Sequence, residues 1–598
     1  MLRAEPLENQ NLLSNRVTEA IERYRRFIFL FIALLLILGF NGRWRLGLDS
    51  ANYRGLALSI ASGRGYIFGD WASHQSYPGL PYALGAVEYL LGPSDRTPSD
   101  AEQQRLLGPS AATSTSVLLV TASGVITLLI IYRLLRLHYA EWIAVTVTCG
   151  VGTNAVFLQY SNELMTDVPF LLGVVLSLYG WDLLTRALDA NARWRAAAVI
   201  VPGVIIAGTT RPMFWVLLVC WAMACAWGFV GGRRRFYGIC LVLVLLAGAA
   251  LLALAPRGYE REAIDWLPHA ISRLGKQIHY TLHDQLPAAV FGEQLAPAST
   301  LGSLLLLGSM LLLIRRHLLW VLIVGCTFVV TVFLSAEPRY YLMVMPTLML
   351  GWLALFCEVA RRVPKFWGEV ILVIGLSLVS LNNLSRSIRF FNEQHHPYTS
   401  RMYKNGEYAG ILQMCQLIRQ HVPMDKLVLG PSGSIMSVLT GRHVVTQREI
   451  APRAATPDTP AALRDKGISF VVLPGKVYRS KEPIIYDLFK RHILKTTGAP
   501  IAETATMKLA PLRVVVPREG VDWRRLKKPL KRPTTRSAAA IARAQITRQR
   551  RAATMNALSP TTRPGAKNRP TTRATTRQSA PRSRASRPST RPAPRGSG

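Results

Sequence analysis

Acidic residues are scarce in this sequence, with 34 Asp and Glu against 71 Lys and Arg in 598 positions. The formal net charge is therefore +37. The segment after Val521 accounts for much of this imbalance, because it holds 21 basic residues and a single acidic one, Asp522. A local excess of this kind reports on the tail rather than on the whole chain. We therefore predict no nucleic-acid partner.

Cysteines are also few, and six of the seven lie in apolar runs, with only Cys415 outside them. A disulfide framework is not expected from this pattern. A small-residue cleavage site is missing after the first apolar run, residues 27–40, which follows Arg23, Arg25 and Arg26. These features are typical of an uncleaved first membrane span rather than a signal peptide. The basic flank predicts a cytoplasmic N-terminus and an outer position for the next loop.

Long apolar runs are what the chain has in abundance, and half of its residues are hydrophobic. With the first run they predict about eleven transmembrane helices in a domain over residues 27–384, after a cytoplasmic segment 1–26. The runs are residues 27–40, 115–132, 142–160, 167–184, 196–210, 213–230, 237–255, 299–314, 318–335, 340–358 and 366–384.

Every connection that this count places inside the cell is basic, as the positive-inside rule requires. We therefore expect a multi-pass protein of the plasma (inner) membrane with an extracytoplasmic C-terminus. The inner basic residues are Arg133, Arg136, Arg186, Arg193, Arg195, Arg233, Arg234, Arg235, Arg315, Arg316, Arg361, Arg362 and Lys365.

The first outer loop, residues 41–114, is too polar to cross a bilayer and is rich in Tyr, Trp, Leu and Gly. Asp49, Tyr53, Leu56 and Ile60 follow one another at steps of three or four, so on a helix they share one face. This pattern indicates a membrane-surface helix that presents a carboxylate. A second interpretation is structural, because Asp directly before a helix is a preferred N-cap.

Other polar residues fall at the outer ends of the predicted spans, on the same side as Asp49. Ionisable groups near the membrane core are costly and usually mark a pathway or a site. The alternative for the two arginines is that they reach toward lipid headgroups. These residues are Asn162, Glu163, Asp167, Arg211, Glu337 and Arg339.

The second outer loop, residues 256–298, contains His279 and His283 at a spacing that shares a helix face. Two such histidines are compatible with a metal site. An interfacial polar face is the favoured interpretation, because the loop has no HExxH motif or third ligand.

Hydropathy falls after the last span, and short β-branched runs alternate with helical patterns over residues 385–520. This alternation predicts a small extracytoplasmic α/β domain with a partly parallel sheet. Residues 430–433, Gly-Pro-Ser-Gly, are expected to form a strand-to-helix turn rather than a phosphate-binding loop. The Arg/Thr/Pro-rich tail, residues 521–598, is predicted to be disordered, either on anionic surfaces or as a passive solvated segment.

Three motifs in this order resemble the GT-C superfamily of membrane glycosyltransferases, which includes protein O-mannosyltransferases and lipid A aminoarabinose transferases. The first is Asp49 just after the first span, followed by Tyr53 and the 77–81 sequence Tyr-Pro-Gly-Leu-Pro. The second is the 164–169 sequence Leu-Met-Thr-Asp-Val-Pro, and the third is Glu337-Pro-Arg-Tyr340 followed by Pro346.

The resemblance implies transfer of a sugar from a polyprenyl-phosphate carrier to an extracytoplasmic protein, lipid or glycan. It implies Asp49 and Asp167 as the catalytic residues. Tyr77 stands where the aminoarabinose branch tends to carry Lys, so the sugar and the involvement of a divalent metal stay open. The implied substrate-binding residues are Tyr53, His74, Tyr77, Arg211, Glu337, Arg339 and Tyr340.

Such a transfer needs a base for the acceptor, cations for the departing phosphate and a lipid-facing approach for the donor. Asp49 suits the first role, and Arg211 and Arg339 suit the second because guanidinium pairs bidentately with phosphate. A transporter or flippase of a lipid-linked or anionic substrate is the competing hypothesis. It is less favoured, because the charges gather on one side and no repeat of interrupted helices is evident. A signalling or wall-anchoring role leaves those charges unexplained.

Overall fold

The computed structural model is mostly helical. It describes residues 15–68, 76–92, 110–230, 234–254, 271–292, 299–334, 337–395, 407–446, 463, 465–474, 494–497, 499–504 and 507–514. The chain divides into two compact units, Met1–Lys527 and Lys528–Gly598, and all described residues belong to the first. The predicted tail and a helix expected over 483–493 lie outside the described residues.

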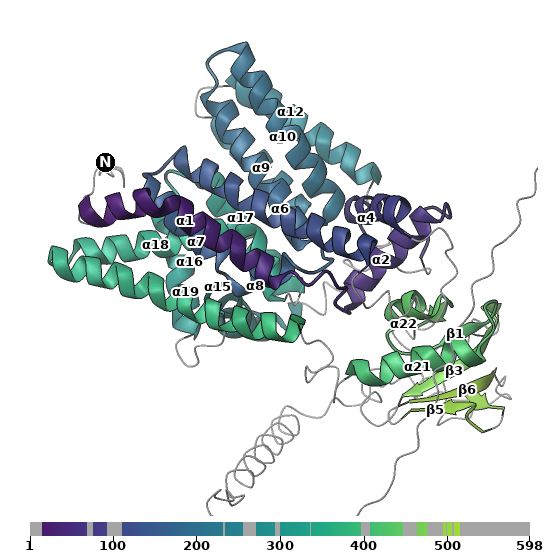
Figure 1. The fold of residues 1–598 in the computed structure, drawn as a ribbon. Coiled ribbons are helices and arrows are strands. Elements are labelled where there is room, and N and C mark those ends of the chain that lie inside the picture. Colours follow the sequence, from purple (N-terminus) through teal and green to yellow (C-terminus); the bar gives the residue numbers. More distant parts are fainter. Residues whose placement is uncertain are drawn as a thin grey trace, which may run out of the picture. The chain divides into compact units, whose positions relative to one another are not determined.

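The apolar runs form helices, as expected (Figure 1). Five of them in the described part of the chain are long and apolar enough to cross a membrane: 111–136, 167–186, 190–210, 338–361 and 365–392. Apolar helices of 10–17 residues, 141–152, 214–230, 299–313 and 318–333, lie in four more of the eleven predicted spans. Up to the last of them the helices are α1 (Asn15–Gly39), α2 (Leu48–Ala61), α4 (Gly79–Leu91), α6 (Ala111–Arg136), α7 (Glu141–Gly152), α8 (Ala155–Tyr160), α9 (Asp167–Arg186), α10 (Ala190–Thr210), α11 (Phe214–Val230), α12 (Arg234–Leu254), α14 (Leu274–Tyr280), η2 (Thr281–Gln285), α15 (Leu286–Phe291), α16 (Ser299–Leu313), α17 (Leu318–Leu334), η3 (Pro338–Val344), α18 (Met345–Arg361) and α19 (Lys365–His395).

Two predicted spans are not single α-helices. The run 142–160 breaks between α7 and α8, where the Asn154 side chain accepts hydrogen bonds from the Val156 and Phe157 amides and caps α8. The run 340–358 begins within η3, a 3₁₀ helix that opens with Pro338 and continues into α18. Arg339 and Tyr340 of the candidate site lie in η3, so this irregular backbone helps to place them.

Helices α9 and α10 lie side by side in an antiparallel pair (Figure 1). Glycines allow their backbones to approach, because a Cβ added at Gly173 would lie 2.5 Å from the Ala207 amide nitrogen. Small residues at such a crossing are typical of helix pairs in membranes. The close approach brings Arg211, which caps the C-terminal end of α10, beside Asp167 at the start of α9.

The first outer loop folds into α2 and α4, which pack on each other (Figure 1). Helix α2 ends at Ala61, and Gly63 and Gly65 follow with left-handed φ angles of 73° and 80°. Only glycine adopts such angles without strain, so these residues stop the helix and reverse the chain.

The described residues after 407 form two helices and a six-stranded sheet of order β2-β1-β3-β6-β4, with β5 also paired to β6. Strands β1, β2 and β3 are parallel, and β6 is antiparallel to β3, β4 and β5. Residues 430–433 lie in the turn between β1 and α22. The elements are α21 (Glu407–His421), β1 (Leu427–Leu429), α22 (Gly433–Thr440), β2 (Val444–Val445), β3 (Ile468–Pro474), β4 (Leu494–Thr496), β5 (Ala502–Glu503) and β6 (Met507–Val514).

Candidate active site

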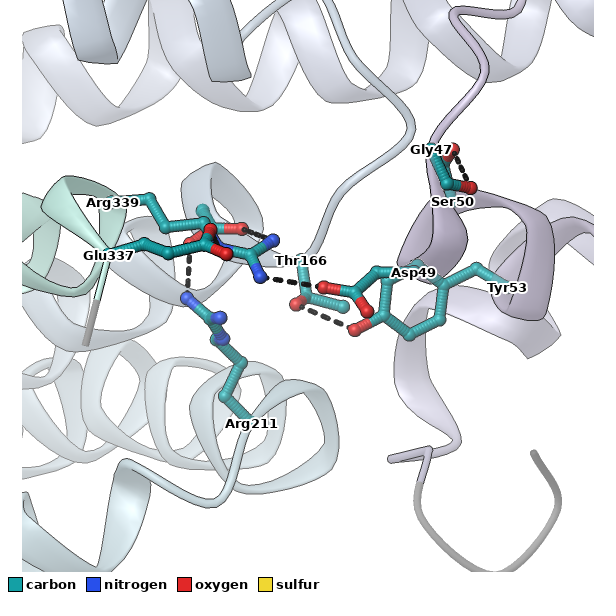
Figure 2. Close-up of polar contacts among 9 residues, drawn as sticks. Gly47, Asp49, Ser50, Tyr53, Thr166, Arg211, Glu337 and Arg339 are labelled. Carbon is teal, nitrogen blue, oxygen red and sulfur yellow. Dashed lines mark hydrogen bonds and ion pairs between the residues drawn. The ribbon is translucent and has the colours of Figure 1, made fainter. Parts of the chain in front are cut away.

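Asp49 lies in the first turn of α2, and the N-cap of that helix is Gly47. The alternative interpretation of Asp49 as the N-cap is therefore wrong. The helix dipole still stabilises a carboxylate in the first turn, because the N-terminal end of a helix carries partial positive charge. Its side chain points to Arg339, whose Nη2 donates to Asp49 Oδ2 at 2.7 Å (Figure 2). The side chain is 41% exposed. The carboxylate is thus held at one oxygen and accessible to a substrate.

Asp167 opens α9, and its side chain is fully buried. Arg211 donates to its Oδ1, and Arg339 Nη1 lies 3.9 Å from its Oδ2. A buried carboxylate needs such partners, because an isolated buried charge is very costly. Asp167 therefore holds both arginines in place at one end of the helices.

Arg339 belongs to η3, and three carboxylates surround it (Figure 2). Besides Asp49 and Asp167, Glu337 Oε2 lies 2.8 Å from its Nε, as an ion pair. The Arg339 side chain is only 10% exposed, whereas the Glu337 side chain is 61% exposed. The arginine is therefore fixed, and two of its partners face outward.

Aromatic rings complete the surroundings of the two arginines. The Arg211 guanidinium carbon lies 4.9 Å from the centroid of the Tyr340 ring, and that of Arg339 lies 5.6 Å from the same ring. Tyr160 lies 6.0 Å from Arg339 on another side. Cation–π contacts of this kind orient a guanidinium plane without neutralising it. The two planar donors are thereby pre-oriented.

Tyr53 links α2 to the start of α9, because its hydroxyl lies 3.3 Å from the Thr166 Oγ1 atom (Figure 2). Burial, with the nearby charge of Asp49, raises the pKa of Tyr53 above its ordinary value. The hydroxyl therefore stays protonated at neutral pH and can act as a hydrogen-bond donor.

Charge is unevenly balanced in this cluster, which holds three carboxylates and two guanidinium groups. Counted at full charge, the cluster carries a net −1. Both arginines are engaged by carboxylates. An anionic ligand must therefore compete with the exposed carboxylates for Arg339.

The structure brings together seven of the nine residues that the sequence singles out. His74 lies outside the described residues. Tyr77 is buried and hydrogen-bonds to Trp215 on α11. The seven are Asp49, Tyr53, Asp167, Arg211, Glu337, Arg339 and Tyr340.

The metal question can be examined on the described residues. Among them, no three His, Cys, Asp or Glu side chains gather in a way that could hold a metal ion. His279 and His283 lie with ring centroids 5.3 Å apart, and His283 Nδ1 lies 3.0 Å from Asp284 Oδ1. We therefore derive no chemical step through a metal.

The sequence did not reveal the contacts that join the segment before α2 to the segment before α9. Arg45, just before α2, forms an ion pair with Glu163, which also accepts from Gln159 Nε2 at 3.0 Å. Thr166 was missed as well, although its position directly before Asp167 is a signal that could have found it. These contacts depend on how separate helix ends face each other, which spacing alone does not show.

No protein-family model and no curated protein sequence matches the chain. Solved structures do resemble its fold. The archaeal oligosaccharyltransferase AglB from Archaeoglobus fulgidus, in complex with an inhibitory peptide and a dolichol-phosphate, has a TM-score of 0.51 and 11% identity over 77% of this chain and 70% of that chain. A second structure of the Archaeoglobus fulgidus enzyme has a TM-score of 0.50 and 12% identity over 76% and 68%.

ArnT from Cupriavidus metallidurans also resembles the chain, with a TM-score of 0.49 and 13% identity over 82% of this chain and 98% of that chain. The likeness to the two AglB structures is a likeness of fold.

Proposed function

We propose that this protein is an inverting glycosyltransferase that moves a sugar from a polyprenyl-phosphate carrier to a protein, lipid or glycan outside the cytoplasm. One observation carries the proposal: an accessible carboxylate, Asp49, pairs with Arg339, and the buried Asp167 holds both Arg339 and Arg211. Of the neighbours, one ArnT structure is bound to undecaprenyl phosphate and AglB is in complex with a dolichol-phosphate. Donors of that chemistry suit the same cluster here.

The donor phosphate would bind Arg339 and Arg211. Because Arg339 is held by carboxylates, the phosphate must replace Asp49 and Glu337 on the guanidinium. Exchange is feasible because these two side chains are exposed and screened by water. Asp167 stays behind as the fixed counter-charge.

The released Asp49 carboxylate would then act as the base. It takes the proton from the acceptor's hydroxyl or amine, and the acceptor atom attacks the anomeric carbon from the face opposite the phosphate. The bond between that carbon and the phosphate oxygen breaks, and its electron pair leaves with the polyprenyl phosphate on the arginines. Positioned bases typically contribute about 10²- to 10⁴-fold in rate. A single displacement of this kind inverts the anomeric configuration.

The proposed orientation places this cluster on the extracytoplasmic face of the plasma (inner) membrane, with the N-terminus inside. The basic inner connections support it. The cluster is built at helix ends, from the first turns of α2 and α9, the cap of α10 and the start of η3. The transporter hypothesis, which calls for a site near the midplane, is less well supported by that placement.

The test is single-turnover sugar transfer from a defined polyprenyl-phosphate donor by wild type and Asp49→Asn. The amide keeps the size of the side chain, so the transfer rate should fall by roughly two to four powers of ten while donor affinity changes little. The matched control is Asp189→Asn, an exposed acid that caps α10 by accepting from the Ala192 amide at 2.6 Å. It should transfer sugar at the wild-type rate.

Two outcomes would contradict the proposal in different ways. A fully active Asp49→Asn enzyme would move the role of base to Asp167 or Glu163. A wild-type protein that transfers no sugar from any donor tested would favour the transporter hypothesis instead.

A further inference from the structure

A second buried ion pair lies outside the charged cluster, on the helix that carries Asp49. Arg54 on α2 and Glu88 on α4 are 3% and 7% exposed, with Nη2 and Oε1 3.5 Å apart. The same Nη2 donates to Thr113 Oγ1 of α6 at 2.9 Å. The Arg54 guanidinium also lies 5.1 Å from the Trp44 ring centroid. The Arg54 side chain therefore joins α2 to two other helices and to Trp44 in the segment before α2.

The energy of this pair does not explain why it is there. Removing two charges from water is costly, and replacing a buried pair with apolar residues of similar size is often neutral or stabilising. Helices α2 and α4 also meet in a close apolar contact, since a Cβ added at Gly85 would lie 3.0 Å from Ile60 Cγ2. Apolar contacts are non-directional. Directional contacts are what fix the rotation and register of one helix on another.

We propose that Arg54 is a positioning residue for the base: through Glu88 and Thr113 it fixes α2 so that Asp49 meets Arg339. This inference rests on the proposed function. Asp49 and Tyr53, four residues apart, share the face of α2 that meets the charged cluster. Arg54, the next residue, lies about 100° around the helix. Helix α2 thus has one face for the chemistry and another that anchors it.

The expected effect is on turnover rather than on donor binding. The donor's phosphate contacts belong to Arg211 and Arg339, which lie on other elements. The base lies on α2. A mutation far from the reacting atoms that displaces a catalytic group by about 1 Å can lower the rate about 100-fold. Loosening α2 should therefore lower kcat by roughly 10- to 100-fold and leave the donor KM within about twofold of wild type.

The experiment compares Arg54→Met, Glu88→Met and the double variant Arg54→Met/Glu88→Met by thermal unfolding and by kcat and KM. Each single variant leaves one buried charge unpaired and should unfold at a lower temperature. The double variant removes both charges, so its unfolding temperature should return to near wild type while its kcat stays low. The control is Arg64→Met, which removes an exposed arginine just after α2 whose Nε donates to Ser62 Oγ at 3.0 Å. It should match wild type in every measurement.

A distance measurement follows α2 without any donor. Spin labels on Arg64→Cys and Leu188→Cys use two exposed positions, one beside α2 and one beyond α9. The described native cysteines are all buried or partly buried, so the labels go to the introduced ones. The distribution of label-to-label distances should be narrow in protein that keeps Arg54 and Glu88. It should shift or broaden in the double variant.

The outcomes separate the two proposals. A double variant with wild-type kcat and wild-type label distances would show that the pair is only structural, and would overturn the positioning role. If the single variants fail to fold, the double variant decides. If wild type transfers no sugar, the proposed function fails, and the label distances alone still report whether Arg54 fixes α2.

Discussion

Two buried arginines in this molecule are built in contrasting ways. Arg54 pairs with one carboxylate, Glu88, and both partners are almost fully buried. Arg339 is buried to a similar degree, yet it is shared among three carboxylates, of which Asp49 and Glu337 are exposed. A closed pair can only break, whereas a shared arginine can exchange an exposed partner for an incoming anion. The first arrangement suits an anchor and the second suits a site.

The largest effect should come from the one buried carboxylate of the shared cluster. Asp167→Asn leaves Arg211 and Arg339 without their fixed counter-charge, and breaking a buried pair costs about 3–5 kcal/mol. We expect a lower unfolding temperature in detergent and loss of turnover. A variant with wild-type stability and activity would show that Arg339 and Arg211 do not depend on Asp167. Asp167 would then not be the fixed counter-charge that the comparison assumes for the shared cluster.

The sequence predicted which charged residues gather, but not how they pair. Counting basic connections placed Asp49, Asp167, Arg211 and Arg339 at the outer ends of helices, so their proximity follows from topology. Which carboxylate faces which guanidinium depends on the rotation of each helix. That rotation depends on contacts between helices, both directional polar contacts and close packing such as that of Gly173 against α10. These helices are too uniformly apolar for periodicity to reveal it.

For the fold, too, the sequence predicted some features and missed others. Strand β1 lies at 427–429 and β3 at 468–474, inside the region where short β-branched runs predict strands, because such runs are a local signal. The break between α7 and α8 was missed, although Asn154 is a preferred cap residue. The Arg54–Glu88 pair was missed as well, because a buried arginine and a surface arginine look alike in a single sequence.

A smaller effect is expected from changing the shape of the shared arginine while keeping its charge. The planar Arg339 guanidinium contacts three carboxylates and is proposed to bind the donor phosphate. Lys at this position would put a point charge in its place. Arg339→Lys should weaken donor affinity by about tenfold, which is about 1.4 kcal/mol, with a smaller change in the single-turnover rate. Arg362→Lys is the matched control, because that side chain is 76% exposed and pairs only with Glu358 among the described residues. Unchanged donor affinity in Arg339→Lys would remove this residue from phosphate binding.

The smallest effect should come from Glu337, the most exposed partner of Arg339. In the proposed exchange it competes with the donor phosphate, so removing its charge should help the donor. Glu337→Gln should bind the donor about two- to threefold more tightly, because exposed ion pairs contribute under about 1 kcal/mol. The gain should shrink at high salt, where the competition is screened. Donor titration at two ionic strengths measures both.

The sign of the Glu337 result decides between two roles for this residue. Weaker binding in Glu337→Gln would mean that the carboxylate contacts the donor directly, and that Arg339 exchanges only Asp49. The sequence resemblance implies only that Glu337 binds substrate. Glu358→Gln provides the control, since Glu358 pairs with Arg361 and Arg362 at partly exposed positions away from the cluster. It should leave donor affinity unchanged at both ionic strengths, because only a carboxylate that shares its arginine with the donor can compete with it.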